Sequence, residues 1–163
     1  MKKKCVFAGT FDPPTVGHQS VIDTCSELFD EVVIAILVNP DKTPCFSVEQ
    51  RKEMLRLTVG ERGNIIVKEY WGTIAELLAQ ENTRYYVRGI RNTVDFEYEN
   101  ANFFASKKLN ADMVAVYLPC PQEILHVSSS IVRNSLRFKT PIEGYVTKDV
   151  EEYIYRIFPD AKA

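Results

Sequence analysis

Apolar residues follow two different spacings along this chain. Residues 31–38 (EVVIAILV) form a continuous apolar run rich in β-branched side chains, which is typical of a strand covered on both faces. The apolar residues of 17–29 recur instead at the spacing of one helix face: Val21, Ile22, Cys25, Leu28 and Phe29. Ser47 and Gln50 fit a capping box that begins a second helix, which closes at Gly60 or Gly63.

The same reasoning extended along the chain predicts a regular alternation of strands and helices. The predicted strands are 4–8, 31–38, 64–70, 84–88 and 112–118, and the further helices are 73–81, 93–109, 128–138 and 149–158. Strands that alternate with helices favour a parallel sheet. We therefore expect an α/β fold with a Rossmann-like, doubly wound, five-stranded parallel sheet and helices on both faces. A length of 163 residues predicts one domain, with the helices after about residue 128 packed on it.

The composition argues against several classes of function, namely nucleic-acid binding, membrane insertion, secretion and metal binding. A formal net charge of -2 argues against nucleic acid as a partner, because such proteins usually carry a basic excess. No apolar run approaches the roughly 20 residues of a membrane span, so no membrane partner is expected. The apolar run 5–9 after three lysines is too short for a signal peptide. The four cysteines have no metal-ligand spacing, and we expect reduced thiols, no protein-bound metal and a cytoplasmic location.

Polar segments follow four of the predicted strands. In open α/β sheets, ligands bind beyond the carboxyl ends of the strands, so these segments should meet at one edge. They are 9–18 (GTFDPPTVGH), 39–44 (NPDKTP), 88–91 (RGIR) and 127–133 (VSSSIVR).

Two of the four segments lead into helices. A helix N-terminus offers unpaired N–H groups and a partial positive charge, which suit a phosphate. For 9–18 alone, a stiff turn with Thr15 as helix cap is an equally good interpretation. Three serines at 128–130 exceed what capping needs, whereas His126 is better read as structural or incidental.

Cations stand in the other two segments. Lys42, Arg88 and Arg91 could contact phosphate oxygens, although each alone could also be an ordinary surface charge. The acidic residues in 95–99 (DFEYE) could form a solvated face, orient the arginines or bind a ribose. Cations from several loops at one edge predict a site for a polyphosphate.

Two motifs resemble the signatures of the nucleotidyltransferase superfamily. Residues 15–18 (TVGH) resemble its T/HxGH motif, and 128–133 (SSSIVR) resemble its ISSTxxR motif. With RGIR at 88–91 and DFEYE at 95–99, the chain looks similar to the bacterial phosphopantetheine adenylyltransferases over residues 4–158. This resemblance implies a nucleotidyltransferase that moves the adenylyl group of ATP to 4′-phosphopantetheine in coenzyme A biosynthesis.

The resemblance also implies roles for individual residues. The catalytic residues would be Thr10, His18, Lys42 and Arg91. The ATP site would contain Gly9, Thr10, Phe11, His18, Gly89, Ile90, Arg91, Glu99, Val127, Ser128, Ser129 and Ser130. The acceptor site would contain Thr10, Lys42, Ile74 and Arg88. The family further implies Mg²⁺ as cofactor, a homohexamer, and coenzyme A as a feedback inhibitor.

The expected residues suit a direct, in-line attack. The acceptor phosphate is already an anion, so it needs cations and positioning more than a strong base. Mg²⁺ would be held chiefly by the phosphates, because the sequence offers no carboxylate cage. Two alternatives stay open. One is another adenylyl- or cytidylyltransferase with a different acceptor, and the other is a nucleotide-binding module without catalysis.

Overall fold

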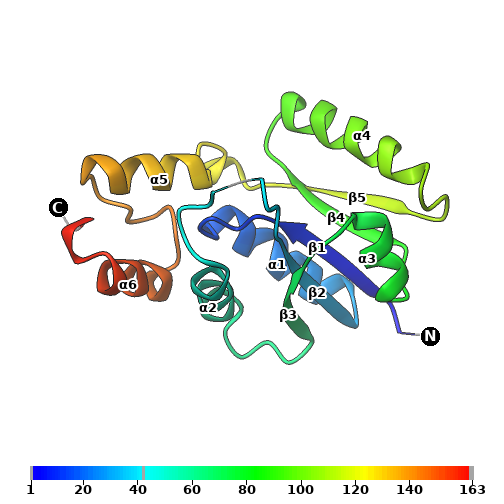
Figure 1. The fold of residues 1–163 in the computed structure, drawn as a ribbon, viewed down its shortest axis with the longest axis horizontal. Helices are drawn as coiled ribbons and strands as arrows, with labels where there is room; N and C mark the ends of the chain where they lie inside the picture. Colours follow the sequence, from blue (N-terminus) through cyan, green and yellow to red (C-terminus); the bar gives the residue numbers. More distant parts are fainter. Residues whose placement is uncertain (1, 42, 162–163) are drawn as a thin grey trace.

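A single parallel sheet forms the centre of the computed structural model, which describes residues 2–41 and 43–161 (Figure 1). Its order is β3-β2-β1-β4-β5, so the first strand of the chain lies in the middle. The strands are β1 (Lys4–Gly9), β2 (Glu31–Leu37), β3 (Ile65–Tyr70), β4 (Tyr85–Ile90) and β5 (Val114–Pro119). The expected five-stranded parallel sheet is confirmed.

Helices connect the strands in the predicted order. The α-helices are α1 (Val16–Leu28), α2 (Val48–Val59), α3 (Ile74–Gln80), α4 (Thr93–Lys107), α5 (Ser129–Phe138) and α6 (Lys148–Ile157), with short 3-10 turns at Gln122–Ile124 and Pro159–Ala161. The capping box of Ser47 and Gln50 is present as predicted, and the helix that it begins closes at Gly60. Within the described ranges, no helix combines the length and the apolar character needed to cross a bilayer.

The two faces of the sheet are covered by different helices. Cys5 and Phe7 of β1 point into an apolar cluster that includes Val21 of α1 and Leu55 of α2. The intervening residues of the same strand point into a second cluster, with Leu77 of α3 and Phe103 of α4. Because side chains alternate along a strand, β1 contributes to both cores. Helices on both faces, as expected for a doubly wound fold, are confirmed.

The last two helices pack beside α2 through a third apolar cluster (Figure 1). In this cluster Phe46 and Met54 meet Val132 of α5 and Ile154 of α6. The connection between α5 and α6 also reaches the first helix, where the Val16 N–H donates to the carbonyl of Tyr145 at 3.0 Å. The C-terminal segment therefore supports the beginning of α1.

The end of β4 differs from the prediction. The strand was expected to end at Arg88, but it continues through Gly89 and Ile90, which pair with Leu118 and Pro119 of β5. Ladder pairing with a neighbour extends a strand beyond its apolar run. Of the RGIR segment, only Arg91 therefore lies beyond the strand. The chain order along the sheet reverses between β1 and β4, which is where such folds bind ligands.

Candidate active site

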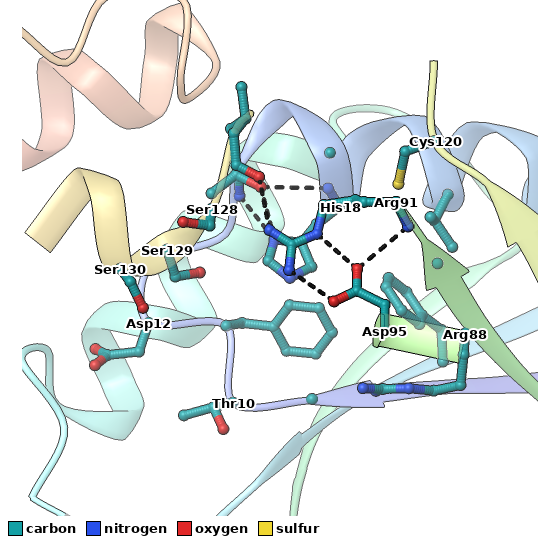
Figure 2. Close-up of a pocket in the computed structure, with 18 of the residues that line it drawn as sticks. Thr10, Asp12, His18, Arg88, Arg91, Asp95, Cys120, Ser128, Ser129 and Ser130 are labelled. Carbon is teal, nitrogen blue, oxygen red and sulfur yellow. Dashed lines mark hydrogen bonds and ion pairs between the residues drawn. The ribbon is translucent and has the colours of Figure 1, made fainter. Parts of the chain in front are cut away.

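A cavity of about 310 Å³ opens at the carboxyl ends of β1 and β4, next to the beginnings of α1 and α5 (Figure 2). Its lining comes from residues 7–21, 88–99 and 120–133, and the segment after β2 contributes no described residue. The predicted site residues that line it are Gly9, Thr10, Phe11, His18, Arg88, Gly89, Arg91, Glu99, Val127, Ser128, Ser129 and Ser130.

Three predicted site residues are not among those lining residues. Ile74, at the start of α3, packs against the apolar cluster under the sheet. Ile90 is a strand residue, and its carbonyl accepts a hydrogen bond from the Cys120 N–H at 3.0 Å. Lys42 lies outside the described residues.

His18 is held in one orientation by the turn that begins α1. Thr15 is the N-cap, and its side chain accepts a hydrogen bond from the His18 N–H. In return, the Thr15 N–H donates to Nδ1 of His18 at 2.9 Å. A backbone N–H can only donate, so Nδ1 is the acceptor and the proton of the neutral ring sits on Nε2. One capping box therefore both starts the helix and fixes the tautomer.

The surroundings of His18 favour its neutral form. Burial, followed by the positive charges of Arg88 and Arg91, lowers the pKa of His18 from 6.5 to about 4. Its ring packs against Phe11, with ring centroids 5.0 Å apart. Phe11 is itself buried at a left-handed backbone position (φ 50°). At neutral pH, His18 thus offers an N–H donor rather than a cation.

Arg91 joins the end of β4 to the entrance of α5. Its Nε and Nη2 donate to the two carboxylate oxygens of Asp95, at 2.8 and 3.2 Å, and its Nη1 donates to the Val127 carbonyl at 3.2 Å (Figure 2). The hydrogen bond from Arg91 is the main reason that the pKa of Asp95 is lowered. Of the three interpretations of the acidic residues, orientation of the arginines is the one that this pair fits.

Arg88 is more enclosed than Arg91. It donates to the Ala8 carbonyl and to the carboxylate of Glu99, and its guanidinium lies over the ring of Tyr86 at 5.8 Å. Its Nε is buried without a hydrogen-bond partner. An unsatisfied buried donor costs free energy, which a bound acceptor would recover. Glu99, expected in the ATP site, here orients Arg88.

The start of α5 presents hydroxyl groups and first-turn N–H groups to the cavity. Ser128 is the N-cap and accepts from the Ile131 N–H at 3.2 Å. The Ser129 hydroxyl donates to the Pro13 carbonyl at 2.7 Å, and the Ser130 hydroxyl accepts from Arg133 at 3.0 Å. The N–H groups of Ser129 and Ser130 have no preceding turn to bond to, so they are available to an anion.

Comparison with known proteins identifies the family. The cytidylyltransferase-like family model matches residues 6–135. Phosphopantetheine adenylyltransferase from Streptococcus agalactiae is 39% identical over 151 residues, covering 92% of this chain and 94% of the relative. The one from Clostridium tetani is 35% identical, covering 91% and 93%. The chain belongs to the phosphopantetheine adenylyltransferase family.

A solved structure supports the fold of this phosphopantetheine adenylyltransferase family member. Nicotinic acid mononucleotide adenylyltransferase from Plasmodium falciparum, complexed with NaAD, superposes with a TM-score of 0.73 and covers 96% of each chain. At 20% identity this likeness concerns the fold alone.

Sequence reasoning did not assign a role to two polar residues of the family's site. The buried Asp12 carboxylate accepts from the N–H groups of Phe46 and Cys45, both at 2.8 Å. Arg133, noticed only as part of the second motif, donates to the Asp12 carbonyl at 2.7 Å. Neither contact leaves a local signal, because the partners are 33 to 121 positions apart.

Proposed function

We propose that this protein transfers the adenylyl group of ATP to the phosphate of 4′-phosphopantetheine, which yields dephospho-coenzyme A and pyrophosphate. The acceptor is the one that the names of its relatives give, and the reaction belongs to coenzyme A biosynthesis. The acceptor phosphate would attack the α-phosphorus of ATP in line, with pyrophosphate as the leaving group.

The chemical character of the cavity is the observation that carries this proposal. Cations, hydroxyls and helix N-termini line it, as charge stabilisation of a phosphoryl-type transition state requires. The Thr15 hydroxyl lies 3.0 Å from Nδ1 of His18, but it is buried and caps α1, so it serves the helix rather than a substrate. Burial raises the pKa of the Cys120 thiol, and Nδ1 of His18 is bonded to the backbone. Positioning two bound anions can lower the barrier by up to about 7–11 kcal/mol in ideal systems.

The proposed roles divide between the two substrates. On the ATP side, Nε2–H of His18 would donate to the α-phosphate, and the first turn of α5 would hold the β- and γ-phosphates. On the acceptor side, Thr10, Lys42 and Arg88 would hold the attacking phosphate. The partnerless Nε of Arg88 supports a role near an anion. Arg91 would act by holding the α5 entrance in place.

We propose that Mg²⁺ enters as part of the substrate, MgATP. The carboxylates beside the cavity are already engaged: Asp12 by backbone N–H groups, Asp95 by Arg91, and Glu99 by Arg88. In the described part of the chain, no three His, Cys, Asp or Glu side chains gather as metal ligands would. The ion would therefore be coordinated by phosphate oxygens and water rather than by carboxylates of the protein.

Pyrophosphate release tests the proposal directly. Purified protein with MgATP should release pyrophosphate and form dephospho-coenzyme A with 4′-phosphopantetheine. It should release none with nicotinamide mononucleotide or without an acceptor. Release with nicotinamide mononucleotide alone would keep the chemistry and replace the acceptor. ATP binding without release under any condition would favour the non-catalytic alternative.

Three further properties belong to the same proposal. A homohexamer is supported by the apolar side chains that α4 exposes, with Val94, Tyr98 and Phe104 at 70%, 68% and 58%. Inhibition by coenzyme A is supported by its chemistry, because it contains the whole product skeleton. A cytoplasmic location is supported by free thiols at all four cysteines.

A further inference from the structure

Two charged side chains beside the cavity are buried, although a buried charge without partners would be strongly unfavourable. Arg51 of α2 is 2% exposed, and Asp12 of the loop after β1 is 6% exposed. Buried charges persist only where hydrogen bonds replace the lost water. Their partners therefore show what these side chains hold together.

Arg51 and Asp12 bind the same two segments to each other. Arg51 donates from Nη1 to the Thr10 carbonyl at 2.8 Å and from Nε to the Phe46 carbonyl at 3.1 Å. Asp12 accepts from the N–H groups of Phe46 and Cys45, both at 2.8 Å. Segment 10–12, at the cavity, is thus joined to segment 45–46, before α2, through four hydrogen bonds to backbone atoms.

The two segments differ in how Phe46 and Thr10 are packed. Phe46 is fully buried, packs in the cluster of α2, α5 and α6, and meets the ring of Phe158 at a centroid distance of 5.4 Å. Thr10 follows β1 directly and is exposed at the cavity (Figure 2). The guanidinium of Arg51 therefore transmits the rigid position of Phe46 to the backbone of Thr10.

We propose that Arg51 is a positioning residue for the acceptor half of the site, which it serves by fixing Thr10 against the segment that precedes α2. This inference rests on the proposed function, in which Thr10 holds the attacking phosphate. The polar contacts of Arg51 with other described residues do not reach the starts of α1 and α5. The starts of α1 and α5, which serve ATP in the proposed roles, are held by Tyr145 and Arg91. Weakening the hydrogen bonds of Arg51 should therefore impair the use of 4′-phosphopantetheine more than the binding of ATP.

Arg51→Lys tests this with the charge retained. An ammonium group is a compact donor without the fork that reaches two carbonyls at once, so the Thr10 carbonyl or the Phe46 carbonyl loses its bond. Arg56→Lys is the matched control, since Arg56 lies on the same helix, is exposed and pairs only with Glu53 at 3.5 Å among the described residues. Thermal unfolding of both variants establishes that they are folded.

The measurements are kcat and KM for each substrate, and calorimetric Kd values for 4′-phosphopantetheine and for the unreactive α,β-methylene-ATP. We expect Arg51→Lys to lower kcat/KM for 4′-phosphopantetheine by about 10- to 100-fold. The Kd for the ATP analogue should be unchanged, and Arg56→Lys should match the wild type throughout. A general structural role would reduce the active fraction and leave both KM values alone.

Two results would overturn the inference while leaving the proposed function intact. The first is that folded Arg51→Lys loses affinity equally for 4′-phosphopantetheine and for the ATP analogue. The second is that it loses neither affinity nor kcat/KM for either substrate. In both cases the wild-type protein must turn over normally. A wild-type protein that neither binds nor converts 4′-phosphopantetheine would instead overturn the proposed function, and this inference with it.

Discussion

Among single residues, the imidazole of His18 shows most directly how local structure determines chemistry. Its Nδ1 is used by the Thr15 N–H, so the atom left for a ligand is a donor. Burial of the ring, followed by the Arg88 and Arg91 charges, opposes a second proton on it. A neutral donor can strengthen its bond as negative charge grows on the phosphate oxygens in the transition state.

Removal of this donor should reduce turnover far more than binding. We expect His18→Ala to lower kcat by about 100- to 1000-fold, the usual cost of one donor to developing charge, with little change in the Kd for ATP. His126→Ala is the control, because His126 is the other histidine and is exposed. Single-turnover kinetics and equilibrium titration measure the two quantities. Parallel losses in both would contradict a transition-state role.

The lowered pKa of His18 also predicts a pH dependence of stability. The folded protein keeps the ring neutral down to about pH 4, whereas the unfolded chain protonates it near pH 6.5. The resulting stabilisation is complete above pH 6.5 and is lost as the pH falls towards 4. From pH 7.5 to 5, wild type should lose about 2 kcal/mol more than His18→Gln in urea unfolding. Identical pH profiles for the two proteins would refute this.

At this scale, the sequence allowed prediction of cavity residues that lie within short motifs. His18, Arg91 and the serines at 128–130 stand beside the helix or strand ends that orient them, so their proximity to the cavity follows from local pattern and fold rule. Asp12 and Arg51 could not be assigned in this way, since their partners are distant in the chain. Arg51 lies in a helix, where a charged residue is normally expected to face solvent, so its burial could not be predicted.

Among the elements, the packing of α1 on β4 depends on a glycine inside the strand. A Cβ on Gly89 would lie 2.7 Å from Cγ2 of Val21, closer than side chains tolerate. The glycine therefore lets α1, which carries His18, lie close against the strand that carries Arg88. This reason for Gly89 is distinct from its predicted contact with ATP.

Gly89→Ala should destabilise the protein by about 1–3 kcal/mol through overpacking. Val21→Ala removes the clashing methyl group, so the double variant should be more stable than the sum of the single effects predicts. Gly63→Ala is the control, because a Cβ there meets no atom within 4 Å. Denaturant unfolding of the four proteins gives the coupling. Additive effects would mean that Val21 is not what limits this position.

Element boundaries show where sequence reasoning stops. Helix starts at Ser47 and Ser128 were predictable because capping is local. The two extra residues of β4 were not, since they depend on pairing with β5. Ile74 was expected in the acceptor site only because of the family resemblance. Its side chain packs against the apolar cluster between the sheet and α3, and sequence periodicity alone does not show which residues surround it.

In the whole molecule, the alternation of strands and helices was enough to predict the sheet and its two covered faces. It could not give the strand order, which depends on long-range pairing, or the contact of Tyr145 with α1. It also could not show that α4 buries only Phe103 among its side chains in the single chain. That last feature bears on assembly.

The proposed homohexamer should depend on the apolar face of α4. We expect Tyr98→Ser with Phe104→Ser to shift the sedimentation of the protein towards smaller species, because exposed aromatic area is lost from the contact. Leu28→Ser is the control, since Leu28 is 56% exposed but lies on α1. Unchanged sedimentation of the double variant would exclude this face from the contact, and a monomeric wild type would reject the hexamer itself.

The central place of β1, and the bond from Val16 to Tyr145, also bear on how the chain acquires its site during synthesis. The first strand leaves the ribosome before both of its neighbours, and the residues that complete the cavity, 127–133, come more than a hundred positions later. A nascent chain that ends before them already contains all five strands but lacks the start of α5 that lines the cavity. The cavity is therefore completed only after the whole sheet has been translated, and Tyr145, which bonds to the start of α1, follows later still.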